Sequence, residues 1–106
     1  MTFLRVEIIR YVEAYQPGIV ACAFSDAEGT RHTFIEKLPL VTAQDLWWDS
    51  TYPQPGSAEC AGVEYFQDAT GRRVARITLD FCESLDSPPV SSFVVLESQL
   101  SDDCCS

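Results

Sequence analysis

The chain has 106 residues, of which 7 are lysine or arginine and 16 are aspartate or glutamate, so its formal charge at pH 7 is −9. A surface of this charge repels phosphates and loses the counterion release that drives most nucleic-acid binding, which argues against nucleic acids and anionic membranes as partners. The length fits a single domain spanning residues 1–106, and 46% hydrophobic residues are enough for one core.

The sequence lacks the signals of membrane insertion and secretion. No stretch approaches the ~20 uninterrupted apolar residues of a membrane span. Arg5, Glu7 and Arg10 interrupt the segment in which a signal peptide requires a continuous apolar region. The cysteines show no CxxC spacing, and three lie singly in apolar runs that are typical of buried thiols. We therefore expect a cytoplasmic protein without a metal or cofactor.

Alternating apolar and polar side chains predict a long first strand at residues 3–14. A turn at 16–18 and a second strand at 19–25 follow. The segment 26–29, Asp-Ala-Glu-Gly, is typical of a type I hairpin turn closed by a glycine, so residues 30–38 should return as a third strand. The residues expected to share the buried face of the first strand are Leu4, Val6, Ile8 and Val12.

The middle of the chain changes character. Thr42 resembles a helix N-cap with an acid three residues later, which predicts one or two helical turns at 43–49. A proline-containing loop then leads to strands at about 57–67 and 72–82. A short last strand is predicted at 93–96, and the tail 99–106 is expected to be disordered.

Two parts of the chain share a pattern of turn residues. Gln-Pro-Gly at 16–18 recurs at 54–56, and the hairpin pattern Asp-Ala-x-Gly-x-Arg at 26–31 recurs at 68–73. The order of these matches indicates two related β-units, at about 16–38 and 54–82. Chance similarity is the alternative, because proline, glycine and aspartate recur in turns for local steric reasons.

These elements predict an all-β domain, namely a small six-stranded antiparallel barrel or a strongly bent sheet with one short helical turn and an internal hairpin repeat. The single helical turn between the third and fourth strands resembles the oligonucleotide-binding (OB) barrel, with the last strand added to it. A Greek-key barrel is the alternative. Either analogy concerns the fold and carries no function.

Residues suited to catalysis are few. His32 is the only histidine, and a lone strand histidine is more typical of a surface or rim position than of a general base. With sixteen acids in the chain, Asp45, Asp49, Glu59 and Glu64 could come close by chance alone. The sequence also has no phosphate-binding glycine motif and no calcium loop.

The central aromatic residues give the best indication of a functional surface. Trp47 and Trp48 are adjacent, so on a helical turn they point about 100° apart and cannot both cover the same side of the core. Tyr52 follows, and Asp45 and Asp49 flank the pair as an acidic rim. We expect these five residues to form a partner-binding site, because tryptophan and tyrosine dominate interface hot spots. The alternative is that the segment plugs an open end of the barrel.

Taken together, these features predict a non-catalytic protein-interaction module with a basic protein partner. One concrete form is an immunity-like protein that covers the basic active site of a toxin enzyme. A small-ligand-binding barrel is the second possibility, and an enzyme of unrecognised type is the third. The sequence does not indicate the oligomeric state.

Overall fold

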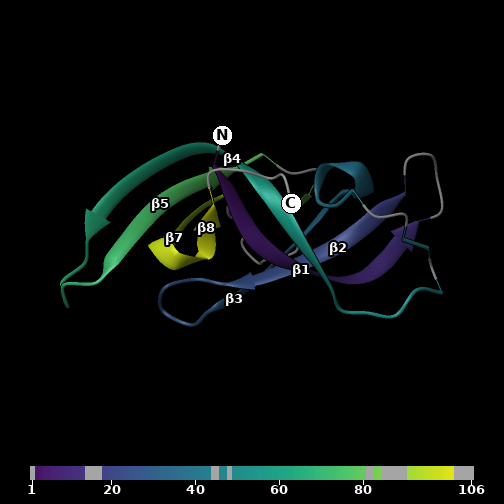
Figure 1. The fold of residues 1–106 in the computed structure, drawn as a ribbon, viewed down its shortest axis with the longest axis horizontal. Helices are drawn as coiled ribbons and strands as arrows, with labels where there is room; N and C mark the ends of the chain where they lie inside the picture. Colours follow the sequence, from purple (N-terminus) through teal and green to yellow (C-terminus); the bar gives the residue numbers. More distant parts are fainter. Residues whose placement is uncertain are drawn as a thin grey trace.

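The computed structural model describes residues 2–13, 18–43, 46–47, 49–80, 83–84 and 91–101. These residues form one antiparallel sheet of eight strands that bends back on itself, together with two 3-10 turns (Figure 1). The elements are β1 (Phe3–Glu13), β2 (Ile19–Ser25), β3 (Arg31–Lys37), η1 (Leu38–Leu40), β4 (Gln54–Gln67), β5 (Arg73–Leu79), β6 (Glu83–Ser84), β7 (Ser92–Leu96), η2 (Glu97–Gln99) and β8 (Leu100–Ser101).

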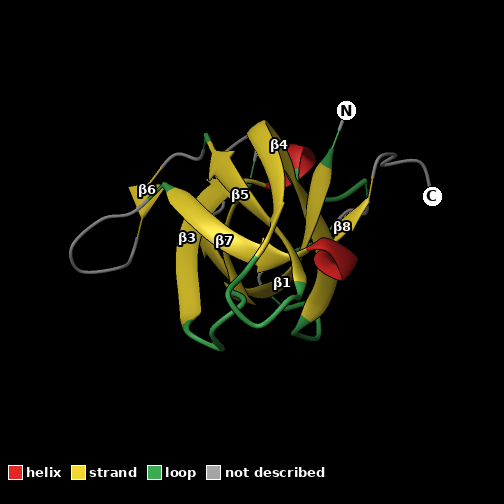
Figure 2. Ribbon diagram, turned by 90° about the vertical axis from the view of Figure 1, so that its left-hand side faces the viewer, coloured by secondary structure: helices red, strands yellow, loops and turns green. Residues whose placement is uncertain are grey.

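The predicted fold class is confirmed, with six longer strands in the predicted order and two short additional ones. The strands lie in the order β6-β3-β2-β1-β4-β5-β7, and β8 pairs with β1. The sheet is a half-barrel, because β3 and β7 face each other across the bend without a ladder between them in the described part of the chain (Figure 2). In the part of the chain that the structure describes, a backbone bond from the Ala27 N–H to the Val94 carbonyl at 2.8 Å joins the two ends.

The core fills the inside of this bend. Its buried members are Leu4, Val6, Ile8, Val20, Cys22, Phe24, Phe34, Val41, Leu46, Ala58, Ala75, Ile77, Leu79, Phe93 and Val95. The predicted inward face of β1 is correct at its first three residues but wrong at Val12. A register shift between Ile8 and Arg10 changes the alternation, so Tyr11 packs against the core in place of Val12.

The two predicted hairpin turns have the same geometry. Gly29 and Gly71 both take positive φ, at +83° and +86°, which a glycine adopts without steric cost. In each turn the glycine N–H donates to the carbonyl of the leading aspartate, Asp26 or Asp68, at 3.0 Å. The strand registers agree as well, since Ser25 pairs with Arg31 and Gln67 with Arg73.

Three boundaries differ from the predictions. A helical turn does lie between the third and fourth strands, but at Leu38–Leu40, and the described residues within 43–49 are not helical. The second Gln-Pro-Gly is not a turn, because Gln54–Gly56 pair with β1 as the start of β4. The tail is ordered further than expected, since η2 and β8 include residues 99–101 and β8 pairs with Phe3 and Leu4. Positions 102–106, and Gln16 and Pro17 of the first match, lie outside the described residues.

Candidate functional site

The Trp47 loop, of which residues 46–47 and 49–53 are described, lies between η1 and β4 and exposes the Trp47 side chain. Leu46 and Tyr52 connect the loop to the core. Leu46 is a buried member of the core, and Tyr52 is partly buried and packs against it. The Trp47 side chain is 55% exposed. Its backbone is fixed, since its N–H donates to Ser50 Oγ at 2.9 Å and its carbonyl accepts from the Tyr52 hydroxyl at 2.6 Å. The Trp47 indole is thus exposed at a backbone position that two side-chain hydrogen bonds hold.

The predicted binding residues are only partly brought together. Trp47 and Asp49 are exposed. Tyr52 is half-buried, and its hydroxyl donates a hydrogen bond to the Trp47 carbonyl. Burial raises the pKa of Tyr52, so this hydroxyl keeps its proton and remains a hydrogen-bond donor. Trp48 and Asp45 lie outside the described residues.

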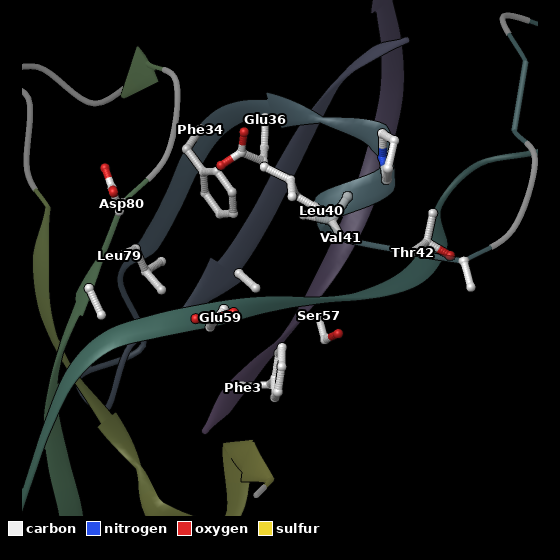
Figure 3. A pocket seen from close by; sticks show the side chains of 14 residues that line it. Phe3, Phe34, Glu36, Leu40, Val41, Thr42, Ser57, Glu59, Leu79 and Asp80 are labelled. Atoms are coloured by element: carbon white, nitrogen blue, oxygen red, sulfur yellow. The ribbon is translucent and has the colours of Figure 1, made fainter. Parts of the chain in front are cut away.

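A cleft of about 540 Å³ opens between β3, η1 and β4, and the described members of the predicted binding site, Trp47, Asp49 and Tyr52, do not line it. Figure 3 shows Phe34 and Glu36 on β3 on one side of this space and the strand β4, which carries Ser57 and Glu59, on the other. The apolar part of its wall is made by Phe3, Phe34, Leu40, Val41, Ala58 and Leu79. The apolar run at 38–41, directly after a strand, was the only sequence signal for it, and Leu40 is 59% exposed there.

The polar part of the cleft is acidic. Glu36, Glu59 and Asp80 contribute carboxyl groups, and none of the described residues that line the cleft is basic. Glu36 is 6% exposed, and its Oε1 accepts the Lys37 N–H at 2.8 Å, which fixes the carboxyl group beside the apolar wall. Apolar walls with carboxylates suit an organic cation, whose charge and hydrocarbon body would both find partners.

His32 is more buried than a rim residue, which corrects the expectation from sequence. Its Nε2 lies 2.8 Å from Asp26 Oδ2, and the two side chains are 13% and 17% exposed. The imidazole packs against Phe24 and Phe93, with ring centroids 5.4 and 4.7 Å apart. Partial burial disfavours the Asp26 carboxylate, but hydrogen bonds from His32, Thr30 and Glu28 outweigh it and lower the pKa of Asp26. The pair joins the first hairpin turn to β7.

Metal binding and thiol chemistry find no support in the described residues, which contain no group of three or more histidine, cysteine, aspartate or glutamate side chains placed to hold an ion. Cys22 and Cys60 are both free thiols. Burial raises the pKa of Cys22 to about 12 and that of Cys60 to about 11, so both remain protonated at neutral pH.

The other predicted carboxylates have separate roles. Glu59 lines the cleft, whereas Glu64 pairs with Arg76 at 3.3 Å on the second hairpin. Arg72 and Arg73 on the same hairpin also pair with acids, Asp68 and Glu97.

No helix in the described part of the chain is long and apolar enough to cross a membrane. A scan against protein-family models finds no match, and comparisons with curated proteins and with solved structures find no significant match either. The fold and the two surface features, the Trp47 loop and the acidic cleft, are therefore the basis for any functional conclusion.

Proposed function

We propose that this chain is a non-catalytic protein-interaction module that binds a basic partner through the Trp47 loop. The observation that supports it is the 55% exposed Trp47 side chain on a backbone held by Ser50 and Tyr52. A large aromatic side chain on a hydrogen-bonded backbone loses little conformational entropy when it binds, which is typical of interface hot spots.

The charge of the chain supports a basic partner. A net charge of −9 steers positively charged surfaces toward the protein and gives association that weakens as salt rises. Asp49, two positions after Trp47, is exposed as well. An immunity-like role, in which the module covers the basic site of a toxin enzyme in the cytoplasm, is the concrete form that we propose.

Affinity capture from the native organism, at low and at high salt, tests this proposal. We expect a basic protein that is retained at low salt, released at high salt and bound at least about 30-fold more weakly by Trp47→Ala, since a hot-spot tryptophan contributes about 2 kcal/mol or more. Leu40→Ala is the matched control, because Leu40 is 59% exposed but lies outside the loop. Capture that survives Trp47→Ala, or that only Leu40→Ala abolishes, would refute a role of the Trp47 loop.

The acidic cleft favours a second candidate, a small-ligand-binding barrel that takes an organic cation. Its volume of about 540 Å³ is in the range of small-molecule sites. Native mass spectrometry of freshly purified protein should show an adduct, and Ala61→Trp, which fills the cleft from β4, should remove it. A bare mass for the wild-type protein would count against this candidate.

A further inference from the structure

The second half of β4 forms an open edge of the sheet. Residues 54–59 of β4 pair with β1, and residues 60–67 pair with β5 on the other side. The pairing with β1 ends where Phe3 meets Glu59. Along residues 61–67, which we call the β4 edge, no strand of the described chain pairs on the side away from β5, and Figure 1 shows this stretch as the outer margin of the sheet.

The hairpin turn fixes which backbone groups point outward from the β4 edge. The Asp68 N–H donates to the Arg72 carbonyl at 3.0 Å, so this pair is hydrogen-bonded. Hydrogen-bonded and non-hydrogen-bonded pairs alternate along an antiparallel ladder. Phe66 and Glu64 therefore bond to β5, whereas the N–H and carbonyl groups of Val63, Tyr65 and Gln67 point away from it. These three residues offer a ready template for another strand.

The side chains of the β4 edge define what kind of strand would fit. Val63 and Tyr65 share one face, where Tyr65 is 46% exposed and lines a shallow groove of about 410 Å³ with Leu100 and the Arg73–Glu97 ion pair. Glu64 lies on the opposite face with a side chain that is 72% exposed. An added strand meets the side chains of Val63 and Tyr65 on the first face. On the second face it meets the Glu64 carboxylate, which also pairs with Arg76 at 3.3 Å.

We propose that the β4 edge binds an extended segment of a basic protein by antiparallel strand addition. Apolar residues of the segment lie opposite Val63 and Tyr65, and a lysine or arginine between them lies opposite Glu64. A second copy of the chain fits less well, because each copy carries a charge of −9 and pairing centred on residue 64 places two Glu64 side chains opposite each other. This surface is separate from the Trp47 loop and goes beyond the function proposed for it.

The probe for this proposal is a synthetic peptide of alternating lysine and valine, and its binding is measured by fluorescence anisotropy. In the proposed register the valines lie opposite Val63 and Tyr65, so their N–H groups point toward β4 and the lysine N–H groups point away. N-methylation of the valines should therefore weaken binding at least tenfold, and N-methylation of the lysines should leave it within about threefold. Equal binding of the two methylated peptides means a purely electrostatic contact and overturns the proposal.

Substitution of the protein gives an independent measurement. Tyr65→Pro removes an N–H that does not bond to β5, a change that edge strands tolerate, and should abolish peptide binding. Tyr65→Thr keeps the N–H but loses the ring, and it should bind the peptide more weakly than the wild-type protein and more tightly than Tyr65→Pro. If circular dichroism shows that Tyr65→Pro does not fold, amide hydrogen exchange of the wild-type protein replaces this test. We expect the peptide to protect the amides of Val63 and Tyr65 from exchange. Unchanged exchange at these two amides would overturn the proposal.

Two further outcomes separate the alternatives. Trp47→Ala should bind the peptide as the wild-type protein does, so failure of one proposal is distinguishable from failure of the other. The free protein could also sediment as a dimer that Tyr65→Pro converts to a monomer. This result would assign the β4 edge to a second copy of the chain and would overturn the proposal.

Discussion

The hairpins β2–β3 and β4–β5 share a turn and a register but bury opposite faces. A shift of 42 positions superposes Asp26 on Asp68 and Phe34 on Arg76. In the first hairpin the face with Phe24 and Phe34 points into the core. In the second, the corresponding face carries the Glu64–Arg76 ion pair, and the opposite face, with Ile77, is buried. Similar local sequences therefore fix a turn without fixing which side of the hairpin is inside.

The two turns also use their aspartates alike. Oδ1 of Asp26 and of Asp68 accepts backbone N–H groups of its own turn, and Oδ2 contacts a basic side chain, His32 in the first turn and Arg72 in the second. His32 lies in the aromatic cluster, whereas Arg72 is exposed and reaches across to the Ala27 carbonyl at 3.1 Å. The same local geometry thus stabilises a partly buried site in one hairpin and a surface site in the other.

The largest expected contrast is between Phe24→Ala and Phe66→Ala, which change the same hairpin position. Phe24 is 4% exposed and packs on Phe34 and Phe93, so its loss should lower the free energy of unfolding by about 3–5 kcal/mol. Phe66 is only half-buried and lies under Arg76, so its loss should cost about 1 kcal/mol. Urea unfolding measures both, and equal losses would contradict the opposite burial of the two faces.

Asp26→Ala should have the next largest effect, about 2 kcal/mol, because it removes charge-assisted hydrogen bonds to His32 and to two backbone N–H groups. Asp68→Ala should destabilise less, since the Asp68 interactions are more exposed to solvent. Thermal melts of the two variants under the same conditions provide the measurement. A larger loss for Asp68→Ala would show that burial does not distinguish the two turns.

Gly29→Ala and Gly71→Ala should each lower the free energy of unfolding by about 1 kcal/mol, and the two losses should be similar. Both glycines have positive φ, and an added Cβ meets no atom within 4 Å at either site, so only backbone strain contributes. Chemical denaturation of the pair checks this equality. A difference much larger than the error of the measurement would mean that the turns are not energetically equivalent.

The smallest effect is a dependence on pH. Hydrogen bonds from Thr70 and Arg72 lower the pKa of Asp68, and the pKa of Asp26 is also below its ordinary value of 3.8. A carboxyl group with a lowered folded pKa stabilises fully above its unfolded value and loses this contribution as the pH falls through the folded value. Urea titrations from pH 6 to pH 2.5 should therefore show a higher free energy of unfolding for the wild-type protein than for Asp26→Asn near pH 6. This difference should shrink below about pH 4. A constant difference across this range would contradict the assignment.

Much of the fold was predictable because its signals are local. The aspartate and glycine of each turn act within five residues, and the alternation of Leu4, Val6 and Ile8 reports the inward face of β1 directly. Tyr11 was missed because a register shift leaves no clear mark in composition. The exposure of one tryptophan was expected from geometry, but the acidic cleft was not, since Glu36, Glu59 and Asp80 come from three distant parts of the chain.

The sequence by itself determined the charge of −9, the positions of the longer strands and the geometry of both hairpin turns, because each depends on composition or on neighbouring residues. Only the tertiary structure decided which face of each hairpin is buried, where the cleft opens and that the β4 edge lacks a described partner. A strand has two faces and two edges, and the bend of the whole sheet selects which of them are covered.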